Sequence, residues 1–307
     1  MMLKGKVGAT TYYVAESRQL ARQSMNNSNY GVNASRTDLQ QVRRVKWSNL
    51  VNFYSGNKAW MKKAYENLKP GVSIFNRFMQ LNIGSAEVAL TKSEAQAKVW
   101  VPARYRVSQG SLQSLTFGYD EGLPYANIVS TITVTETTTV AQIATNLIAN
   151  NPSLRNGDAI AFVSFTGTNA NPGEAEGVIS ASYQYRELVL NTADESVFAQ
   201  KYPDFQIANN RITCAVGRGE LASVWIHTRK NAGSLYVSTQ DIVLNDVEIN
   251  SYDEWRSAAQ VAKAIASYGE STTVPLAPGG QGSLGSGNDS STGGGSTPGG
   301  DGGGSLG

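Results

Sequence analysis

The spacing of apolar residues changes once along this chain, near Gly84, and that change limits the folds it can adopt. Before Gly84 apolar residues recur every three or four positions, as on one face of a helix. After it they alternate with polar residues, as in a half-buried strand. The sequence therefore predicts an α+β protein, with a small N-terminal helical region followed by an antiparallel β sandwich or barrel. The expected parts are an extended arm at 1–35, a helical region at 36–83, a β-rich domain at 84–250, a C-terminal helix at 251–268 and a Gly/Ser-rich tail at 269–307.

Three short amphipathic helices are expected in the helical region, each with one apolar face. Their expected bounds are a cap at Ser35 or Thr37 to Tyr54, then 60–68 after a break at Gly56, then 72–81. Such helices can bury a small core together or a larger one against the strands that follow. In the arm before them, only the run 10–14 has a β-like pattern.

Seven candidate strands follow the helices, each with alternating apolar residues and each bounded by Gly, Asn, Pro or Asp. They are expected at 99–107, 128–135, 159–165, 179–190, 211–216, 221–228 and 234–244. One helix is expected to interrupt them at 139–148, where the apolar residues fall on one side. The C-terminal helix is expected to begin at a capping box formed by Ser251 and Glu254.

The chain has one histidine, His227, and one cysteine, Cys214. This excludes most Ser-His and Cys-His nucleophile arrangements and most zinc sites. We expect His227 to be a strand residue partly covered by its neighbours and Cys214 to be a small buried side chain. The carboxylates are scattered, mostly beside turn residues, and Asn156-Gly157-Asp158 fits a tight turn that enters a strand. We therefore expect no enzymatic activity, no catalytic residue, no metal, no cofactor and no small-molecule substrate.

Charge is distributed unevenly along the chain. Residues 1–70 contain twelve Lys or Arg and three acidic residues, a net charge of +9, whereas the remaining residues carry 14 basic and 21 acidic groups, a net charge of −7. Such an asymmetry can steer a partner, or neighbouring copies, into one orientation. The candidates for a basic surface are Arg43, Arg44, Lys46, Lys62 and Lys63. They fit the solvated face of ordinary helices, a contact with an acidic protein neighbour, or a contact with DNA.

Aromatic residues are the strongest candidates for anchors of a protein interface, because buried aromatics dominate interface energetics. The candidates are Trp47, Phe53, Trp60, Tyr65, Phe75, Phe78 and Trp255. The composition also favours contact with other proteins. Hydrophobic residues make up 40% and charged residues only 16%, so the surface is expected to be polar and largely uncharged.

No apolar run approaches the roughly 18 residues that a membrane span needs, so we expect no membrane partner. The first residues lack the apolar stretch of a secretory signal. This predicts a product that begins in a cytoplasm.

Several short motifs resemble an uncharacterised family of gut Bacteroidetes and of their tailed phages, including crAss-like phages. The motifs lie between residues 4 and 245 and include Lys4-Gly5-Lys6-Val7-Gly8, Arg44-Val45-Lys46-Trp47, Trp60-Met61-Lys62-Lys63-Ala64-Tyr65-Glu66, Val107-Ser108-Gln109-Gly110-Ser111-Leu112 and Val237-Ser238-Thr239-Gln240. The resemblance implies a phage or prophage setting. Together with the composition it favours a non-enzymatic structural component of a virion (capsid, collar or tail). Its partners are then other virion proteins and copies of itself, and its location is the virion, assembled in the host cytoplasm.

Two other functions remain open from the sequence. One is a surface-exposed module that binds a receptor or glycan, with Tyr183, Tyr185, Trp225 and Tyr236 on adjacent strands as flat faces for sugars. The other is a protein that contacts DNA through the basic residues of 1–70.

Overall fold

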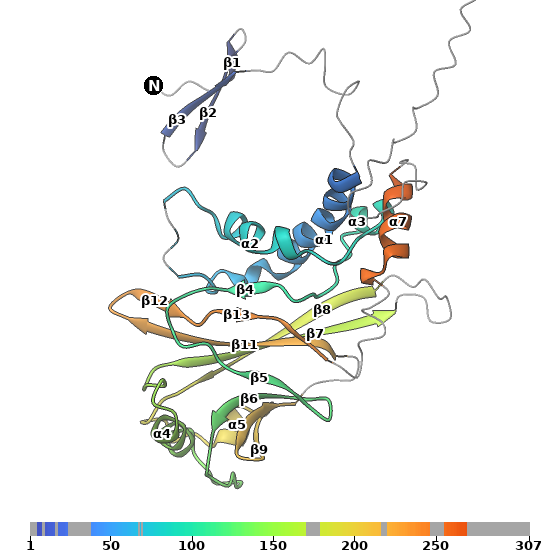
Figure 1. Cartoon of the computed structure of the whole chain (residues 1–307). Helices are drawn as coiled ribbons and strands as arrows, with labels where there is room; N and C mark the ends of the chain where they lie inside the picture. The colour runs from blue at the N-terminus through green and yellow to red at the C-terminus, as the bar shows by residue number, and fades with distance from the viewer. Residues whose placement is uncertain are drawn as a thin grey trace, which may run out of the picture.

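The structure is a computed structural model that describes residues 5–7, 10–15, 18–23, 38–66, 68, 70–169, 179–215, 220–245 and 255–268. Three layers stack in it, as Figure 1 shows: helices, a central five-stranded sheet, and an outer four-stranded sheet with two further helices. The sheets are antiparallel and face each other as in a sandwich. The prediction of an α+β fold is confirmed.

The helical layer contains α1 (Asp38–Met61), α2 (Ile74–Asn82), the 3-10 helix η2 (Ile83–Ser85), α3 (Lys92–Gln96) and α7 (Ala258–Ser267). The expected break at Gly56 is wrong, because α1 continues through it and no separate helix covers 60–68. Gly56 lies against the indole of Trp100, where a Cβ atom would overlap the ring. The glycine therefore permits a close approach and does not end the helix. The third expected helix is confirmed as α2, which is capped by the side chain of Ser73.

The expected strand at 99–107 is also wrong for most of its length, since only β4 (Arg106–Ser108) is a strand. Side-chain amides replace the backbone partners that a neighbouring strand would supply. Asn49 Nδ2 donates to the carbonyl of Val101 at 3.0 Å, and the N–H of Val101 donates back to Asn49 Oδ1 at 2.8 Å. Asn82 makes the same two-way contact with Arg106. These buried amides hold 99–106 as an extended segment on the helices.

The central sheet contains β7 (Ala159–Asn169), β8 (Ile179–Val189), β11 (Glu220–Asn231), β12 (Ser234–Val237) and β14 (Val243–Leu244). The expected strands at 159–165, 179–190 and 221–228 are confirmed. The single strand expected at 234–244 is wrong, because it is divided into β12, β13 (Gln240–Asp241) and β14. Of these, β13 pairs with β4 instead of with β11.

The two faces of the central sheet belong to two different cores. Toward the helices, Phe53 of α1 lies in a ring cluster with Phe78, Trp100, Tyr105 and Phe165, at centroid distances of 5.3–5.8 Å. Toward the outer sheet, alternate residues of the same strands form the second core, in which the side chains of Phe162 and Trp225 pack with centroids 4.6 Å apart. The first of these cores contains side chains from both the helices and the central sheet, so the helical region and the β-rich domain are packed together through it.

The outer layer contains β5 (Phe117–Asp120), β6 (Leu123–Val129), β9 (Phe205–Ala208) and β10 (Arg211–Cys214), with α4 (Val140–Asn150) and α5 (Phe198–Lys201). The inserted helix and the strand at 211–216 are confirmed. The strand expected at 128–135 is wrong, because β6 ends at Val129, and β5 and β9 were not predicted. The two hairpins of this sheet turn at Glu121-Gly122 and Asn209-Asn210, where all four residues have positive φ.

The ends of the chain differ from expectation where they are described. In the expected arm, β1 (Gly5–Val7), β2 (Thr10–Ala15) and β3 (Arg18–Gln23) form an antiparallel sheet, longer than the single run predicted at 10–14. The expected capping box of Ser251 and Glu254 and the Gly/Ser-rich tail at 269–307 lie outside the described residues. The cap of α7 is Ser257, whose side chain accepts from the N–H of Gln260.

Candidate functional site

Most of the aromatic interface candidates lie inside the chain's own core. Phe53 and Phe78 are fully buried, and the exposed fractions of Trp60, Tyr65 and Trp255 are 6–7%. These five side chains are therefore not available as interface anchors in this fold, and that prediction is corrected. Trp47 is exposed, and Phe75 is half-buried against Tyr54 with ring centroids 5.2 Å apart.

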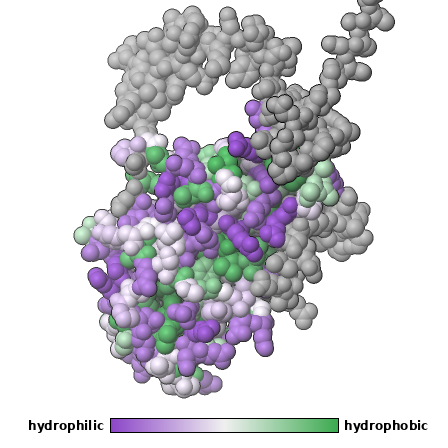
Figure 2. Space-filling model, in the orientation of Figure 1, coloured by the Kyte–Doolittle hydropathy of each residue, from purple (hydrophilic) through white to green (hydrophobic). Residues whose placement is uncertain are grey.

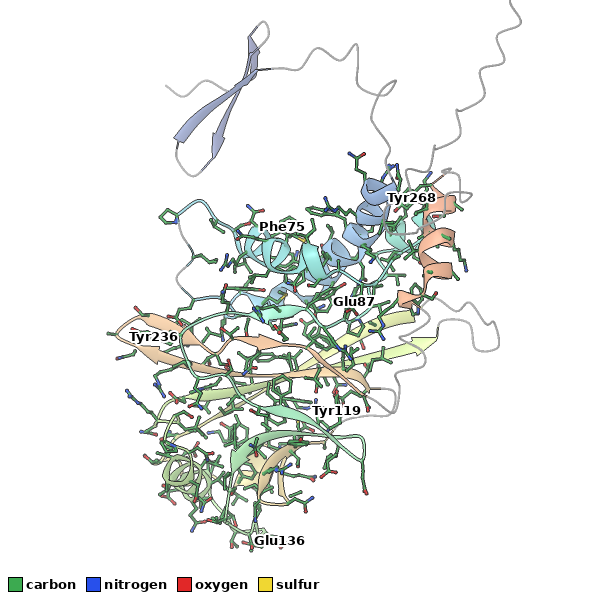
Figure 3. All side chains as sticks on the ribbon, viewed as in Figure 1. Phe75, Glu87, Tyr119, Glu136, Tyr236 and Tyr268 are labelled. Atoms are coloured by element: carbon green, nitrogen blue, oxygen red, sulfur yellow. The ribbon has the colours of Figure 1, made fainter. Side chains whose placement is uncertain are left out.

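The predicted basic residues remain at the surface of α1 and of the turn that follows it. Arg43, Arg44, Lys62 and Lys63 are exposed, and Lys46 is half-buried. The guanidinium of Arg44 stacks on the ring of Tyr268, beside α7 (Figure 3). Over 40–66 and 70–105, the helical layer carries ten Lys or Arg and three Glu, a net charge of +7. Figure 2 shows hydrophilic and hydrophobic residues mixed over the visible face of the molecule.

The outer layer, on the other side of the central sheet, has the opposite charge. Over 117–158 and 191–215 it carries seven Asp or Glu and three Lys or Arg, a net charge of −4. Asp120, Glu121, Glu136 and Glu195 are exposed among these acids. The molecule is thus polarised across its three layers, with a basic helical face and an acidic sheet face.

The four aromatics proposed as a sugar-binding face do not form one. Trp225 is fully buried in the second core. Tyr183 and Tyr185 lie on the side of β8 that faces the helices, whereas Tyr236 lies beside Arg229 on the opposite side of the central sheet (Figure 3). The platform predicted from these strands is therefore wrong. The strand pattern placed the tyrosines in strands but could not tell which face each strand turns to the core.

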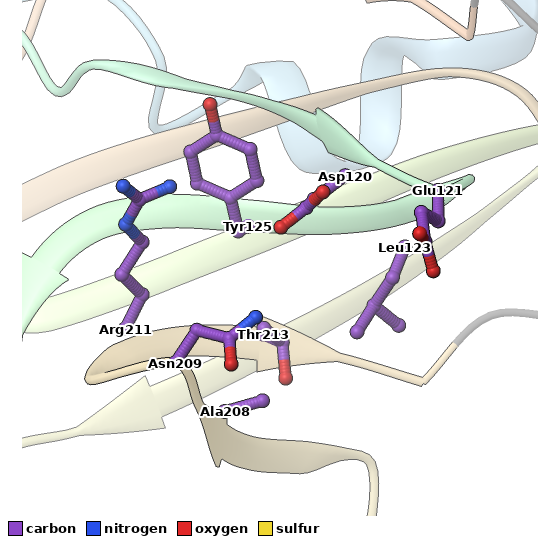
Figure 4. Close-up of a pocket in the computed structure, with 8 residues that line it drawn as sticks. All are labelled: Asp120, Glu121, Leu123, Tyr125, Ala208, Asn209, Arg211 and Thr213. Atoms are coloured by element: carbon purple, nitrogen blue, oxygen red, sulfur yellow. The ribbon is translucent and has the colours of Figure 1, made fainter.

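A different pocket lies on the outward face of the outer sheet, between its two hairpin turns, which lie at opposite ends of the paired strands β6 and β10 (Figure 4). It has a volume of about 340 Å³ and is lined by Asp120, Glu121, Leu123, Tyr125, Ala208, Asn209, Arg211 and Thr213. The guanidinium of Arg211 stacks on the ring of Tyr125 at 4.7 Å. Neighbouring strands place these residues on one face, since Tyr125 pairs with Thr213 across β6 and β10.

The pocket combines an aromatic face with hydrogen-bonding groups of several kinds. Two carboxylates accept, a guanidinium donates, and an amide and a hydroxyl do both. Within the described part of the chain, neither Asp120 nor Glu121 is in an ion pair, so their oxygens face solvent and any bound ligand. Such an open, mixed surface can bind a polyhydroxylated ligand through ring stacking and paired hydrogen bonds. The sequence contained the two turns but gave no sign that residues beside both of them line one pocket.

A second polar site is buried beside β11. Asp158 Oδ2 lies 2.7 Å from His227 Nε2, and Asp158 Oδ1 accepts from Arg229 Nε at 2.7 Å. Burial raises the pKa of Asp158, but the hydrogen bonds from Arg229 and His227 outweigh burial and lower the pKa to about 2. His227 is fully buried, so the expectation of a partly covered strand histidine is corrected. The expected turn before β7 is confirmed, with Gly157 at positive φ.

A third polar site contains a buried carboxyl at the start of β11. Glu220 Oε1 accepts from the hydroxyl of Tyr119 on β5 at 2.9 Å, between the two sheets (Figure 3). Burial raises the pKa of Glu220 to about 8, although the Tyr119 hydrogen bond and the charge of Arg186 act in the opposite direction. Glu220 Oε2 has no hydrogen-bond partner among the described residues. No sequence signal singled out Glu220 or Asp158, because a turn-flanked acid is normally solvated.

Cys214 lies in the second core, where burial raises the pKa of its thiol to about 12. The thiol is therefore protonated at neutral pH, in agreement with the expected small buried side chain. In the described ranges, no three His, Cys, Asp or Glu side chains gather in a way that could hold a metal ion. No helix within those ranges is both long and apolar enough to cross a membrane.

Comparison of the chain with protein-family models, with curated proteins and with solved structures finds no match.

Proposed function

We propose that the chain is a non-enzymatic structural subunit of a tailed-phage virion, which works by self-association and by docking onto other virion proteins. The resemblance of residues 4–245 to a family of gut Bacteroidetes and their phages supports the phage setting. The observation that carries the assembly role is the opposite charge of the two outer layers, +7 on the helical layer and −4 on the outer sheet. Faces of opposite charge orient subunits as they meet and suppress wrong contacts.

The separation of basic and acidic faces also fits an assembly built from many copies of one subunit. A basic face and an acidic face on opposite sides of one molecule give a head-to-tail contact, which extends into rings or longer arrays. Many weak copies of such a contact hold together by avidity, so no single interface has to be strong. Trp47 and Phe75 are the predicted anchors that still reach the surface of the helical layer.

The test is the mass of the purified chain by light scattering across a concentration series, at low and at high salt. We expect a mass above that of the 32.8 kDa monomer, falling toward it as salt rises. Lys62→Glu on the helical layer should weaken association, whereas Lys230→Glu, an exposed position on the central sheet with the same change in charge, should not. A strict monomer at every concentration, which also fails to bind other virion proteins, would contradict the proposal.

Glycan binding is a second candidate function, and the pocket at Tyr125 and Arg211 is the observation that favours it. Here the chain is a surface-exposed module that docks on a host sugar. A glycan array probed with the whole chain tests it. Tyr125→Ala should abolish any binding because it removes the stacking face, and Tyr236→Ala on β12 is the matched control.

DNA contact is a third candidate, favoured by the exposed cations of α1. Here the chain should bind to heparin and shift DNA in a gel, with an affinity that falls steeply as salt rises. Substitution of Arg43, Arg44 and Lys46 should remove the shift. If these substitutions weaken self-association and leave DNA binding unchanged, the basic face serves protein contacts.

A further inference from the structure

The two larger sheets end in strands of very different length. Among the described residues, the outer sheet ends in β5 and β9, and the central sheet ends in β12 and β8. The strands β5, β9 and β12 have four residues each, whereas β8 has eleven. Proteins usually keep edge strands short or cover them, because a long bare edge is a template for pairing with another strand. The edge of β8 therefore requires an explanation.

The backbone of β8 presents every second N–H and C=O away from β7. At the end of the strand, the N–H of Leu190 donates inward to the carbonyl of Asp158, whereas the N–H of Val189 points outward to the hydroxyl of Tyr202. The register between β7 and β8 runs without a shift from Val189 to Ile179. Since inward and outward groups alternate along an antiparallel strand, the amides of residues 181, 183, 185 and 187 point outward.

The usual protections of an edge are missing from β8 in the described structure. The strand has no proline, no lysine and no bulge. Its one arginine, Arg186, turns toward the outer sheet, where it bonds Asp204 at 2.7 Å. Tyr185, near the middle of the strand, is 38% exposed, and so is Val189 at its end. Among the described residues, the edge thus combines exposed apolar surface with backbone groups that no neighbouring strand pairs.

We infer that β8 pairs antiparallel with β8 of a second copy, so that the central sheets of two copies become continuous. This inference rests on the proposed function, because it adds a second contact between copies, a two-fold pairing of sheet edges, to the head-to-tail contact of the charged faces. The partner has to be an extended strand, since only a strand satisfies alternate N–H and C=O groups along such an edge. A two-fold pair presents the same patch on both copies.

The side chains of β8 are complementary to themselves in this arrangement. With Tyr185 opposite Tyr185 of the second copy, Glu187 faces Tyr183 and Arg186 faces Gln184. Tyrosine with glutamate, and arginine with glutamine, are the pairs that already form hydrogen bonds within the strand, at 3.1 Å and 2.6 Å. No two like charges face each other. A second copy therefore fits this edge better than an arbitrary strand.

The test compares two substitutions of one residue in the full chain. Tyr185→Pro removes an outward N–H without touching the ladder to β7, and a proline is tolerated at such an edge position. Tyr185→Ala removes the same side chain but keeps the N–H. By sedimentation velocity, the proline variant should have a dimer dissociation constant roughly tenfold or more above that of the alanine variant. Equal dissociation constants for the two variants would overturn the inference.

Amide hydrogen exchange of the unmodified chain gives an independent readout. The amides of 182, 184 and 186 should exchange slowly at every concentration, because they belong to the ladder with β7. Those of 181, 183, 185 and 187 should exchange fast when the chain is dilute and slowly when it is concentrated. Slow exchange at every dilution would mean that the chain covers its own edge, which overturns the inference. Fast exchange at every concentration also overturns it. If the chain still associates in that case, the proposed function stands, and if it remains monomeric, both fail.

Discussion

The buried carboxyl of Glu220 makes a sharp prediction for the pH dependence of stability. Its pKa is raised by burial from an ordinary 4.5 to about 8. The folded chain therefore holds a proton that the unfolded chain releases between these two values. A proton bound more tightly in the folded state stabilises it at low pH, and this stability is lost as the pH rises through the folded pKa.

The magnitude follows from the shift. One pKa unit is worth 1.36 kcal/mol, so the free energy of unfolding should fall by about 2.5 kcal/mol from pH 5 to pH 7 and by about 4 kcal/mol from pH 5 to pH 9. These are upper values, because water and small rearrangements relieve part of the cost of a buried charge. Glu220→Gln keeps an acceptor for the Tyr119 hydroxyl and cannot ionise. It should therefore match the unmodified chain near pH 5 and exceed it in stability by at least about 2 kcal/mol at pH 9.

Urea unfolding followed by tryptophan fluorescence measures this difference, because Trp225 reports on the same core. The quantity of interest is the unfolding free energy of Glu220→Gln minus that of the unmodified chain at pH 5, 6, 7, 8 and 9. Other titrating groups cancel in this difference. Glu136→Gln, an exposed acid of the same layer, is the control and should give a flat difference. A Glu220→Gln difference that varies by less than about 0.5 kcal/mol over this range would refute the reasoning.

Three further substitutions test the packing. Phe53→Ala should destabilise the chain by about 3–5 kcal/mol in urea, because four other rings surround the side chain, and a loss below about 1 kcal/mol would contradict the shared core. Asp158→Asn should cost about 2–3 kcal/mol at pH 7, since it removes the buried carboxylate that pairs with Arg229, whose half-buried guanidinium keeps only its bond to the carbonyl of Ser153. Its deficit should shrink as the pH falls from about 4 toward 2, where the native carboxyl takes up a proton. Gly110→Ala should lower the melting temperature because its Cβ would overlap the carbonyl of Val237, whereas Gly84→Ala, which meets nothing within 4 Å, should not.

The strands and helices with strong local patterns could be predicted from the sequence. The strands β7, β8, β10 and β11 are alternating or continuously apolar runs, and α4 has an apolar stripe behind the capping residue Thr139. The segment 99–106 could not be predicted, because its partners are asparagine side chains from helices about 20 to 50 residues away. A strand-like pattern of residues does not show whether the backbone N–H and C=O groups will bond to another strand or to side-chain amides.

The candidate sites were harder to predict than the fold, and the reason is physical. An amphipathic helix shows that one face is covered, but it does not show whether the cover belongs to the same chain. Trp60 and Phe78 fit an interface as well as a core, and the structure places both in the core. The pocket at Tyr125 depends on two hairpin turns about ninety residues apart in the chain, so only the pairing of β6 with β10 reveals it.

The contact between α1 and α7 has a consequence for how this protein is made. Val45 of α1 packs against Val261, Ala264 and Ile265 of α7, so the cover of this helix is synthesised about 200 residues after the helix itself. Until residue 265 has emerged, that side of α1 stays bare on the nascent chain, where chaperones and premature partners can reach it. The helical layer can therefore close only after the strands of both sheets have been synthesised.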